Sequence, residues 1–559
     1  MPKLRSLAAN SPTRRSHWQA LGLTEEDMAK PKIAVINSSS ELAVCFAHLD
    51  GVAKVVKEAI RGAGGVPFEV RTTAPSDFIT GANKSGSYIL AARDIVTHDI
   101  EVQVEAALLD GMICLTSCDK TPPGHLMAAA RLNIPTILVI GGYQASGMIG
   151  DDHIDLEDLW SGSIGERFGK PLKHPVEEMI PQAVRGPGVC AGMATANTMH
   201  CVVEALGMCI PGSAPVRANS EKMFDKAREA GRRIVEMVNE DLKPRQILTE
   251  AAFRNAAAMT LAVSGSINAI KHLQAIAVEA GSDADLFAIW EEVGRKVPVL
   301  SAVRPNGPVR IEGFEDAGGA AAMLKRLAPV LDTSVMTCMG KPLSEVIDAT
   351  PDGDTDIIRP LDQPISDNPS IVILKGSLAP ASAVVKIGIR DPRRPESFEG
   401  PARVFDDGPT LLDALEDGTI KAGDVVILRG QGPKGGPAMG GGASMVLFAI
   451  DAAGMARDVA FVTDGQLSGL CLKGLTIAEV SPEAVDGGPL GKVRDGDTVV
   501  IDVAERRLDL MVDPAELAAR PIEAKPLSAH PTGYLDLYRR DVQPMAKGTV
   551  LIQTPGEPA

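Results

Sequence analysis

Apolar runs alternate with helical stretches from Lys32 onward, and this alternation restricts the N-terminal part of the chain to few folds. Helical stretches are predicted from about His48 to Gly62 and from about Tyr88 to Leu109. The apolar runs between and around them are KIAVIN, VPFEV, GMICLT and IPTILVIGG. Strands and helices in this order form a parallel sheet with helices on both faces. In such sheets, ligands bind at the carboxyl ends of the strands.

The pattern then changes twice. From about Ser220 to Leu331, apolar residues recur at helical spacing, which predicts a helical extension of the first domain. Beyond about Pro364, short apolar runs are separated by Gly, Asp and Pro, as in SIVILKGSL, AVVKIG, GDVVILRG, VAFVTDG, DTVVIDV and RRLDLMV. These runs predict strands of a compact β-barrel or sandwich with a few helices. We therefore expect two domains, an α/β domain over residues 1–365 and a β-rich, barrel-like domain over residues 366–559.

Composition narrows the class of partner. The 559 residues carry a formal net charge of -16, which argues against binding nucleic acid or an anionic membrane, so a small-molecule partner is expected. No uncharged apolar stretch of about 18 residues occurs, and no apolar segment follows the basic N-terminus, so we expect a cytoplasmic protein. Eight cysteines are too few for a disulfide scaffold in a chain of this length and should be buried thiols or ligands.

The tripeptide Cys118-Asp119-Lys120 directly follows the predicted strand GMICLT and precedes a predicted helix. A soft thiolate beside a hard carboxylate suits two different metals, a thiophilic iron centre and an oxygen-preferring ion such as Mg²⁺. A strand-to-helix turn with a capping aspartate and a buried cysteine explains the tripeptide equally well.

Three further positions could complete such a site. Cys190 follows the turn Gly186 to Gly188, and the residues after it suggest a helix, whose N-terminus would favour a thiolate. Cys45 also follows a predicted strand, so three thiols could gather on one cluster and leave an iron position open. Asp77 lies in a loop after a strand and could be a metal ligand. Close packing for Cys190 and a turn role for Asp77 remain the alternatives.

The other candidate motifs give weaker evidence of a functional site. Ser468 in VTDGQLSGL does not match the G-x-S-x-G elbow of hydrolases. The run GPKGGPAMGGG lacks the Gly-Lys-Ser/Thr ending of a phosphate loop and has no matching strand-to-helix pattern, so we expect a flexible loop at a site. Cys471 is undecided. The remaining cysteines are expected to be core thiols, and the lone histidines to be hydrogen-bonded structural residues. These are Cys114, Cys201, Cys209, Cys338, His48, His125 and His200.

Taken together, the segments resemble the family of dihydroxyacid, sugar-acid and phosphogluconate dehydratases over nearly the whole chain. The resemblance is carried by CDKTPPGHLMAA, CAGMATANTM, EALGMCIPGSA, GSINAIKHLQAIA, LKGSLAPASAVVKI, GPARVFDDG, GDVVILRGQGPKGGPAM, TDGQLSG and VSPEAVDGGPL. It implies an N-terminal α/β domain, a C-terminal barrel-like swivelling domain, an active site between them, and a homodimer or homotetramer.

The resemblance also assigns cofactors and roles. It implies an iron-sulfur cluster, for which we expect 2Fe-2S in preference to 4Fe-4S although three cysteines can hold either, and an Mg²⁺ or Mn²⁺ ion. The residues on the family's ligand positions are Cys45, Cys118 and Cys190 for the cluster and Asp77, Asp119 and Lys120 for the divalent ion, with Lys120 carbamylated. Ser468 matches the serine proposed as base. The implied reaction removes water from a 2,3-dihydroxy carboxylic acid, a sugar acid or a branched dihydroxy acid, to give a 2-keto acid.

One departure from the family bears on the metal site. Where the family places a third carboxylate ligand, two residues beyond the methionine of GGPAM, this chain has Gly441. Smaller departures are AVCF around Cys45, His125, and LCLKG after the serine. Gly441 motivates one alternative, a noncatalytic iron-sulfur redox or iron sensor. A further alternative is an enzyme on the same scaffold that eliminates something other than water.

Overall fold

Four parallel strands form the sheet of the N-terminal half in the computed structural model, which describes residues 4–8, 11–81, 86–389, 394–439, 441–467, 474–526 and 532–551. Their order is β2-β1-β3-β4, with bounds β1 Lys32–Asn37, β2 Val66–Arg71, β3 Gly111–Thr116 and β4 Thr136–Ile140. All residues of β1, β3 and β4 are buried, as expected for strands covered on both faces. The strand order reverses between β1 and β3. In parallel sheets, ligands bind at the carboxyl ends of the two strands on either side of such a reversal.

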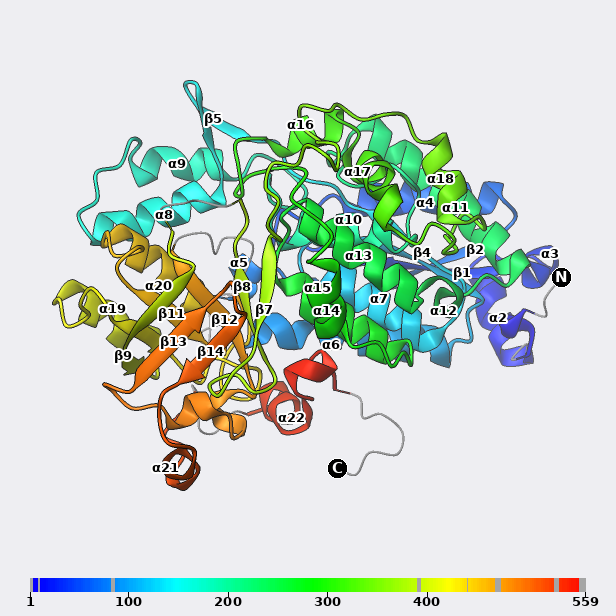
Figure 1. Ribbon diagram of the computed structural model, residues 1–559. Coiled ribbons are helices and arrows are strands. Elements are labelled where there is room, and N and C mark those ends of the chain that lie inside the picture. Colours follow the sequence, from blue (N-terminus) through cyan, green and yellow to red (C-terminus); the bar gives the residue numbers. More distant parts are fainter. Residues whose placement is uncertain are drawn as a thin grey trace.

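Helices cover this sheet as the sequence predicts (Figure 1). The connections are α4 (Leu49–Gly62), α6 (Tyr88–Ala106) and α7 (Thr121–Leu132). Right-handed crossovers place α4 on one face and α6 and α7 on the other, because the chain reverses direction after β2. Helix α11 (Glu221–Glu240) packs on α4, β3 and β4.

The predicted helical extension is confirmed. Its larger helices are α11, α13 Glu250–Ala262, α14 Asn268–Glu279, α15 Leu286–Val293 and α17 Gly319–Leu327. Helix α10 (Thr195–Ala205) precedes the predicted range, and both α10 and α14 are almost wholly buried. The remaining elements of this half are α1 Arg5–Ala8, α2 Pro12–Ala20, α3 Glu25–Ala29, α5 Asp77–Thr80, β5 Gly147–Ile149, β6 Asp152–Ile154, α8 Leu156–Arg167, α9 Val176–Ala183, α12 Pro244–Ile247, α16 Ile311–Asp316 and α18 Leu343–Ala349.

The C-terminal half contains an eight-stranded sheet that curls into a nearly closed, barrel-like shape, so the predicted fold class is confirmed (Figure 1). The order is β14-β13-β9-β10-β11-β12-β8-β7. The bounds are β7 Ile371–Leu374, β8 Ser382–Lys386, β9 Ser397–Phe405, β10 Val425–Leu428, β11 Ala460–Thr463, β12 Leu475–Ser481, β13 Thr498–Asp502 and β14 Arg507–Leu510. The helices are α19 Gly408–Glu416, α20 Gly441–Ala452, α21 Pro514–Ala519 and α22 Tyr534–Asp541. The boundary at 365/366 stays a prediction.

One expectation about this half is wrong. The glycine-rich run was expected to have no strand-to-helix pattern, yet it connects β10, which ends at Leu428, to α20, which begins at Gly441. Strands β9 to β12 pair in parallel, and α19 and α20 are the crossovers between them. Helix α20 was not expected because three glycines, which disfavour a helix, precede its apolar run.

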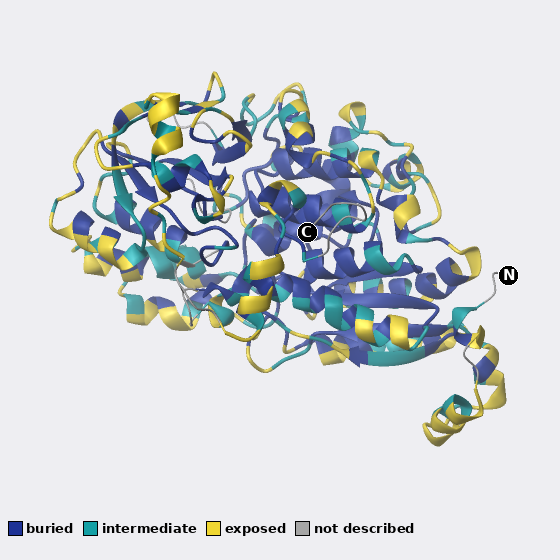
Figure 2. Ribbon diagram, turned by 90° about the horizontal axis from the view of Figure 1, so that it is seen from below, coloured by how far each residue is buried: buried dark blue, intermediate teal, exposed yellow. Residues whose placement is uncertain are grey.

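One hydrophobic cluster includes residues of both halves, and a second lies wholly within the C-terminal half; Figure 2 shows buried residues in both. Trp160 of α8 meets Phe448 of α20 edge to face, with ring centroids 5.9 Å apart. Near the C-terminus the chain returns to the first half, where the Arg93 guanidinium donates hydrogen bonds to the carbonyls of Gly548 and Thr549. No helix within the described ranges has both the length and the apolar character needed to cross a bilayer.

Candidate active site

The Cys118-Asp119-Lys120 tripeptide lies between β3 and α7, at the carboxyl end of the sheet, as predicted. The Thr121 hydroxyl accepts a hydrogen bond from the Ser117 amide at 2.9 Å, and the Thr121 amide donates to the Cys118 carbonyl at 3.0 Å. The Ser117 hydroxyl donates to the carbonyl of Cys45, which follows β1. This last bond joins the segments that follow β1 and β3, at the position where the strand order reverses.

The structure brings the thiols of Cys45 and Cys118 together. Hydrogen bonding with the Cys118 thiol lowers the pKa of Cys45. The same interaction raises the pKa of Cys118, and burial adds to the effect. The Cys118 sulfur also lies 3.8 Å from Oδ1 of Asp119. Two neighbouring thiols cannot both ionise freely, so a cation that binds both thiolates would relieve their repulsion.

Cys190 joins this group electrostatically, but not in the predicted way. Burial raises its pKa, and the charges of Asp119 and Cys45 raise it further. The expected helix begins only at Thr195, so Cys190 does not lie at a helix N-terminus and its thiolate gains no stabilisation there. Instead, the Asn197 amide donates to the carbonyls of Cys190 and Gly192, at 2.9 and 2.8 Å, and holds a turn around the cysteine.

Two carboxylates and a lysine lie beside the thiols. The Nζ atom of Lys120 is 2.7 Å from Oδ2 of Asp77 and 3.9 Å from Oδ2 of Asp119, and the Lys120 side chain is fully buried. The other oxygen of Asp77, Oδ1, is buried without a hydrogen-bond partner among the described residues. Burial, with Asp77 as the second cause, raises the pKa of Asp119 to about 7. A divalent cation would satisfy the free oxygen and remove the repulsion between the carboxylates.

Two predicted positions cannot be placed in this geometry. Ser468 and Cys471 fall in 468–473, outside the described residues. Gly441 is the first residue of α20, the helix that follows the glycine-rich loop.

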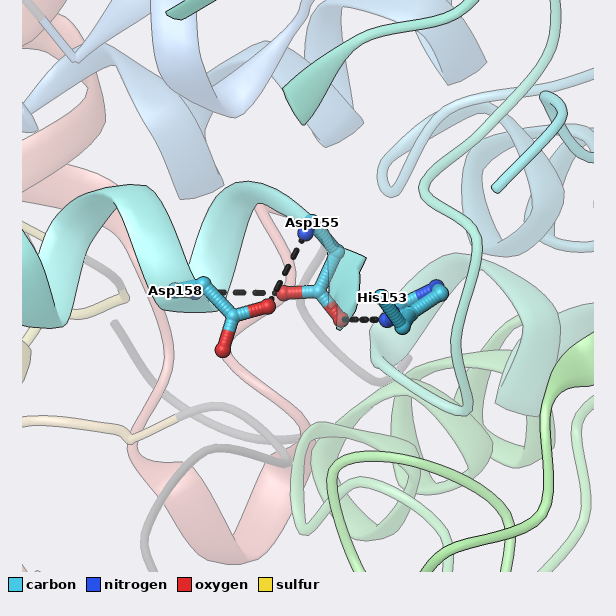
Figure 3. Close-up of side chains that lie close together, drawn as sticks. All are labelled: His153, Asp155 and Asp158. Atoms are coloured by element: carbon cyan, nitrogen blue, oxygen red, sulfur yellow. Dashed lines mark hydrogen bonds and ion pairs between the residues drawn. The ribbon is translucent and has the colours of Figure 1, made fainter. Parts of the chain in front are cut away.

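An acidic group lies near Cys190. Figure 3 shows its members, Asp155, Asp158 and His153. Asp155 caps α8, Asp158 follows in its first turn, and the His153 ring lies 3.7 Å from Asp155. The Arg304 guanidinium forms ion pairs with both aspartates, at 3.1 and 2.9 Å, and offsets part of their negative charge. Asp155, Trp160 and Cys190 line a small shared pocket, so this group borders the candidate site.

The sequence analysis missed three polar residues at the junction of the halves, Lys271, Gln466 and Glu479. Each is almost fully buried and has no side-chain hydrogen bond to any residue that the structure describes. Lys271 stands in GSINAIKHLQAIA, where a charge within an apolar helical run was a signal that could have found it. Gln466 and Glu479 gave no comparable signal.

The structural roles expected for the remaining cysteines and histidines are largely confirmed. Rings of two histidines bond to backbone carbonyls, His48 to Gly141 at 2.6 Å and His200 to Ser117 at 3.1 Å. His125 differs, since neither ring nitrogen has a partner in the described part of the chain. Burial raises the pKa of all four expected core thiols, which are Cys114, Cys201, Cys209 and Cys338.

Comparison with known proteins gives one consistent result. Residues 30–346 match the N-terminal model of the dihydroxy-acid/6-phosphogluconate dehydratases, and residues 356–549 match the C-terminal model. A dihydroxy-acid dehydratase of Methanococcoides burtonii is 41% identical over 96% of this chain and 97% of its own length. Proteins of the same name are 41% identical in Ignicoccus hospitalis, over 92% of each chain, and 40% identical in Acetivibrio thermocellus, over 96% of this chain and 97% of that protein.

Proposed function

Because this chain belongs to the dihydroxy-acid/6-phosphogluconate dehydratase family, we propose that it is a hydro-lyase that converts a 2,3-dihydroxy carboxylic acid to a 2-keto acid. The observation that carries the proposal is the buried group at the ends of β1 and β3, where thiols lie beside the Asp77–Lys120 pair. Soft sulfur donors next to hard oxygen donors suit a site that handles two unlike metals.

The donor sets fit the two cofactors. Cys45, Cys118 and Cys190 would hold an iron-sulfur cluster of the 2Fe-2S type, and Asp77, Asp119 and Lys120 would hold Mg²⁺ or Mn²⁺. The unpartnered Oδ1 of Asp77 supports the second set, since a buried carboxylate oxygen needs a partner. Carbamylation of Lys120 would replace its positive charge by a third anionic oxygen group, in a chain where Gly441 supplies none. When bound, the two groups supply Lewis acidity at the 3-hydroxyl and at the carboxylate with the 2-hydroxyl.

The chain's own residues supply the proton chemistry. We assign to the Oγ atom of Ser468, ionised to the alkoxide, the removal of the proton from C2, while the C3–O bond breaks and its electron pair leaves with the oxygen as hydroxide. The serine hydroxyl then gives the proton to this hydroxide, so that water is released and the alkoxide is restored. The resulting enol tautomerises to the 2-keto acid. The hydrogen at C2 is weakly acidic, so this step needs a base held close to C2 and shielded from bulk water.

Product analysis tests this proposal. The protein, purified without oxygen and supplied with Mg²⁺, is incubated with a panel of 2,3-dihydroxy acids, and the 2-keto acids are trapped with semicarbazide and measured by absorbance. We expect one keto acid per substrate consumed and dependence on Mg²⁺. Consumption with a different product would instead support another elimination on the same scaffold.

The glycine at position 441 favours one second candidate, a noncatalytic iron-sulfur sensor. Loss of a carboxylate ligand weakens a magnesium site while leaving the three cysteines intact. A sensor would retain iron and sulfide, respond to oxidation in its visible spectrum, and turn over none of the acids at any Mg²⁺ concentration.

The resemblance to the family also motivates a proposal on assembly and location. We propose a homodimer or homotetramer in the cytoplasm, with the site near the subunit interface. Light scattering on the purified protein gives the mass of the assembly, and a mass of 58.6 kDa, that of a single chain, would contradict it.

A further inference from the structure

Three polar side chains are buried at the junction of the two halves without hydrogen-bond partners in the described ranges. They are Lys271 from α14, Gln466 from the segment after β11, and Glu479 from β12, with exposed fractions of 0%, 1% and 0%. An unsatisfied buried polar group costs about 1–3 kcal/mol, and a charged one costs more. A bound molecule with several hydroxyl groups would supply partners to all three.

The three side chains act on one another. Burial lowers the pKa of Lys271, and Glu479 is the largest influence that opposes it. Burial raises the pKa of Glu479, and Lys271 and Gln466 oppose that effect. Yet no hydrogen bond joins the Lys271 Nζ atom to the Glu479 carboxylate. The opposite charges therefore lie close enough to attract each other but are not in contact.

The backbone holds Glu479 in a special conformation. Strand β12 carries a bulge between Ala478 and Ser481, where its register with β8 shifts. Glu479 has a φ of +54°, a region that residues other than glycine rarely adopt, and its amide donates to the Gly465 carbonyl at 3.0 Å. Bulges and such strained residues recur at functional sites because they re-aim a side chain.

This group lies beside the candidate active site. The charge of Lys120 contributes to lowering the pKa of Lys271, which places the two lysines within electrostatic range. Gln466 stands two residues before Ser468 and bridges to Met439 of the glycine-rich loop. Met439 in turn packs against Ile89 and Leu90 of α6, in the half that carries the cysteines.

We propose that Lys271, Gln466 and Glu479 form a substrate-binding subsite for hydroxyl groups beyond C3, so that the substrate is a polyhydroxy (sugar) acid and not a branched alkyl dihydroxy acid. The inference rests on the proposed function and assigns its substrate class. Glu479 accepts hydrogen bonds from substrate hydroxyls, Lys271 donates to their oxygens, and the Gln466 amide does both.

An alkyl chain could not satisfy these groups. A methyl or ethyl branch offers no donor or acceptor, so its binding would leave a lysine, a glutamate and an amide unpaired in a dry environment. A site built to bond a substrate hydroxyl rejects the analogue that lacks it far more strongly than an apolar pocket rejects an extra methylene. The subsite therefore determines selectivity more than rate.

Selectivity is the quantity to measure. The kcat/KM values of the anaerobically purified holoenzyme are compared for a panel of five- and six-carbon aldonic acids and for 2,3-dihydroxy-3-methylbutanoate. The wild-type protein should prefer at least one aldonic acid by more than about 100-fold. Lys271→Met and Glu479→Gln should each lower that ratio by about 100-fold. The double variant removes both buried charges together, which keeps the test valid if a single variant folds poorly.

Lys386→Met is the matched control. Lys386 is also a buried lysine at the junction, but its Nζ donates to the Ser264 carbonyl at 2.9 Å, so its loss should leave the selectivity ratio unchanged. Calorimetric binding of the preferred aldonic acid gives a second readout, in which the Lys271 and Glu479 variants should bind at least about 10-fold more weakly.

The outcomes separate the two proposals. Turnover of 2,3-dihydroxy-3-methylbutanoate in preference to every aldonic acid would overturn the subsite and leave the dehydratase proposal standing. Aldonate binding that depends on Lys271, without turnover of any acid, would support the subsite and remove the dehydratase proposal. Neither binding nor turnover would remove both.

Discussion

The Nζ atom of Lys120 lies 2.7 Å from Oδ2 of Asp77, although 43 residues separate them in the sequence. Lys120 follows β3, and Asp77 begins the short helix α5 after β2. A buried lysine beside two carboxylates is stable as an ion pair. A carbamate formed on the same lysine would lie close enough to these carboxylates to bind one cation together with them. The fold therefore brings together Lys120 and Asp77, two of the residues proposed to hold the divalent ion.

Asp77→Asn should abolish most of the Mg²⁺-dependent turnover. The substitution keeps the shape but removes the charge that both Lys120 and a divalent cation need. Since changes behind a ligand already cost 10–100-fold in metal affinity, we expect a loss of more than about 100-fold. Activity is measured across an Mg²⁺ titration, with the exposed Asp536→Asn as control. Wild-type Mg²⁺ dependence in the variant would exclude Asp77 as a ligand.

Gly441→Glu should tighten the metal site. The first turn of a helix tolerates a glutamate well, because the helix dipole favours negative charge there. If the loop before α20 follows the family path, the added carboxylate should lower the Mg²⁺ concentration for half-maximal activity by about 10-fold. An unchanged value would mean that the loop follows another path.

Ser468→Ala should stop turnover without disturbing the cofactors. The hydroxyl is assigned only to proton removal, so iron, acid-labile sulfide and the visible spectrum should equal those of the wild-type protein. Retained turnover would exclude the serine from the mechanism. A lost spectrum would show instead that the segment supports the cluster.

Stability should depend on pH through Glu204. This buried carboxylate accepts hydrogen bonds from the amides of Gly212 and Ala214, and burial raises its pKa from 4.5 to about 7. The folded protein holds the Glu204 proton more tightly than the unfolded chain does. The stability that protonated Glu204 contributes is therefore complete below pH 4.5 and is lost as the pH rises to 7.

Glu204→Gln removes that titration. The variant should therefore lose more stability relative to wild type at pH 5 than at pH 7, by an amount on the order of 1–3 kcal/mol. Urea denaturation of both proteins at the two pH values measures this difference. An equal loss at both values would contradict the raised pKa.

Part of the candidate site could be predicted because two of its cysteines follow strands. Periodicity located β1 and β3, and ligands in parallel sheets gather where such strands end, so Cys45 and Cys118 could meet there; their role as cluster ligands stays a prediction. The expected place of Cys190 at a helix N-terminus was wrong, because the helix starts only at Thr195. The glycine-rich sequence before this helix does not define where it begins. The contact of α14 with the C-terminal half depends on how the two halves pack, and local patterns carry no information about it. Lys271 carried a signal, a charge within an apolar helical run, whereas Glu479 became a candidate only in three dimensions.

The most direct test is the content of iron and acid-labile sulfide per chain, with the visible spectrum, in protein purified without oxygen. The account predicts about two iron and two sulfide ions per wild-type chain and their loss in Cys118→Ala. Anaerobic wild-type protein without iron or sulfide would contradict it, and the three cysteines would then be buried thiols in a dehydratase fold.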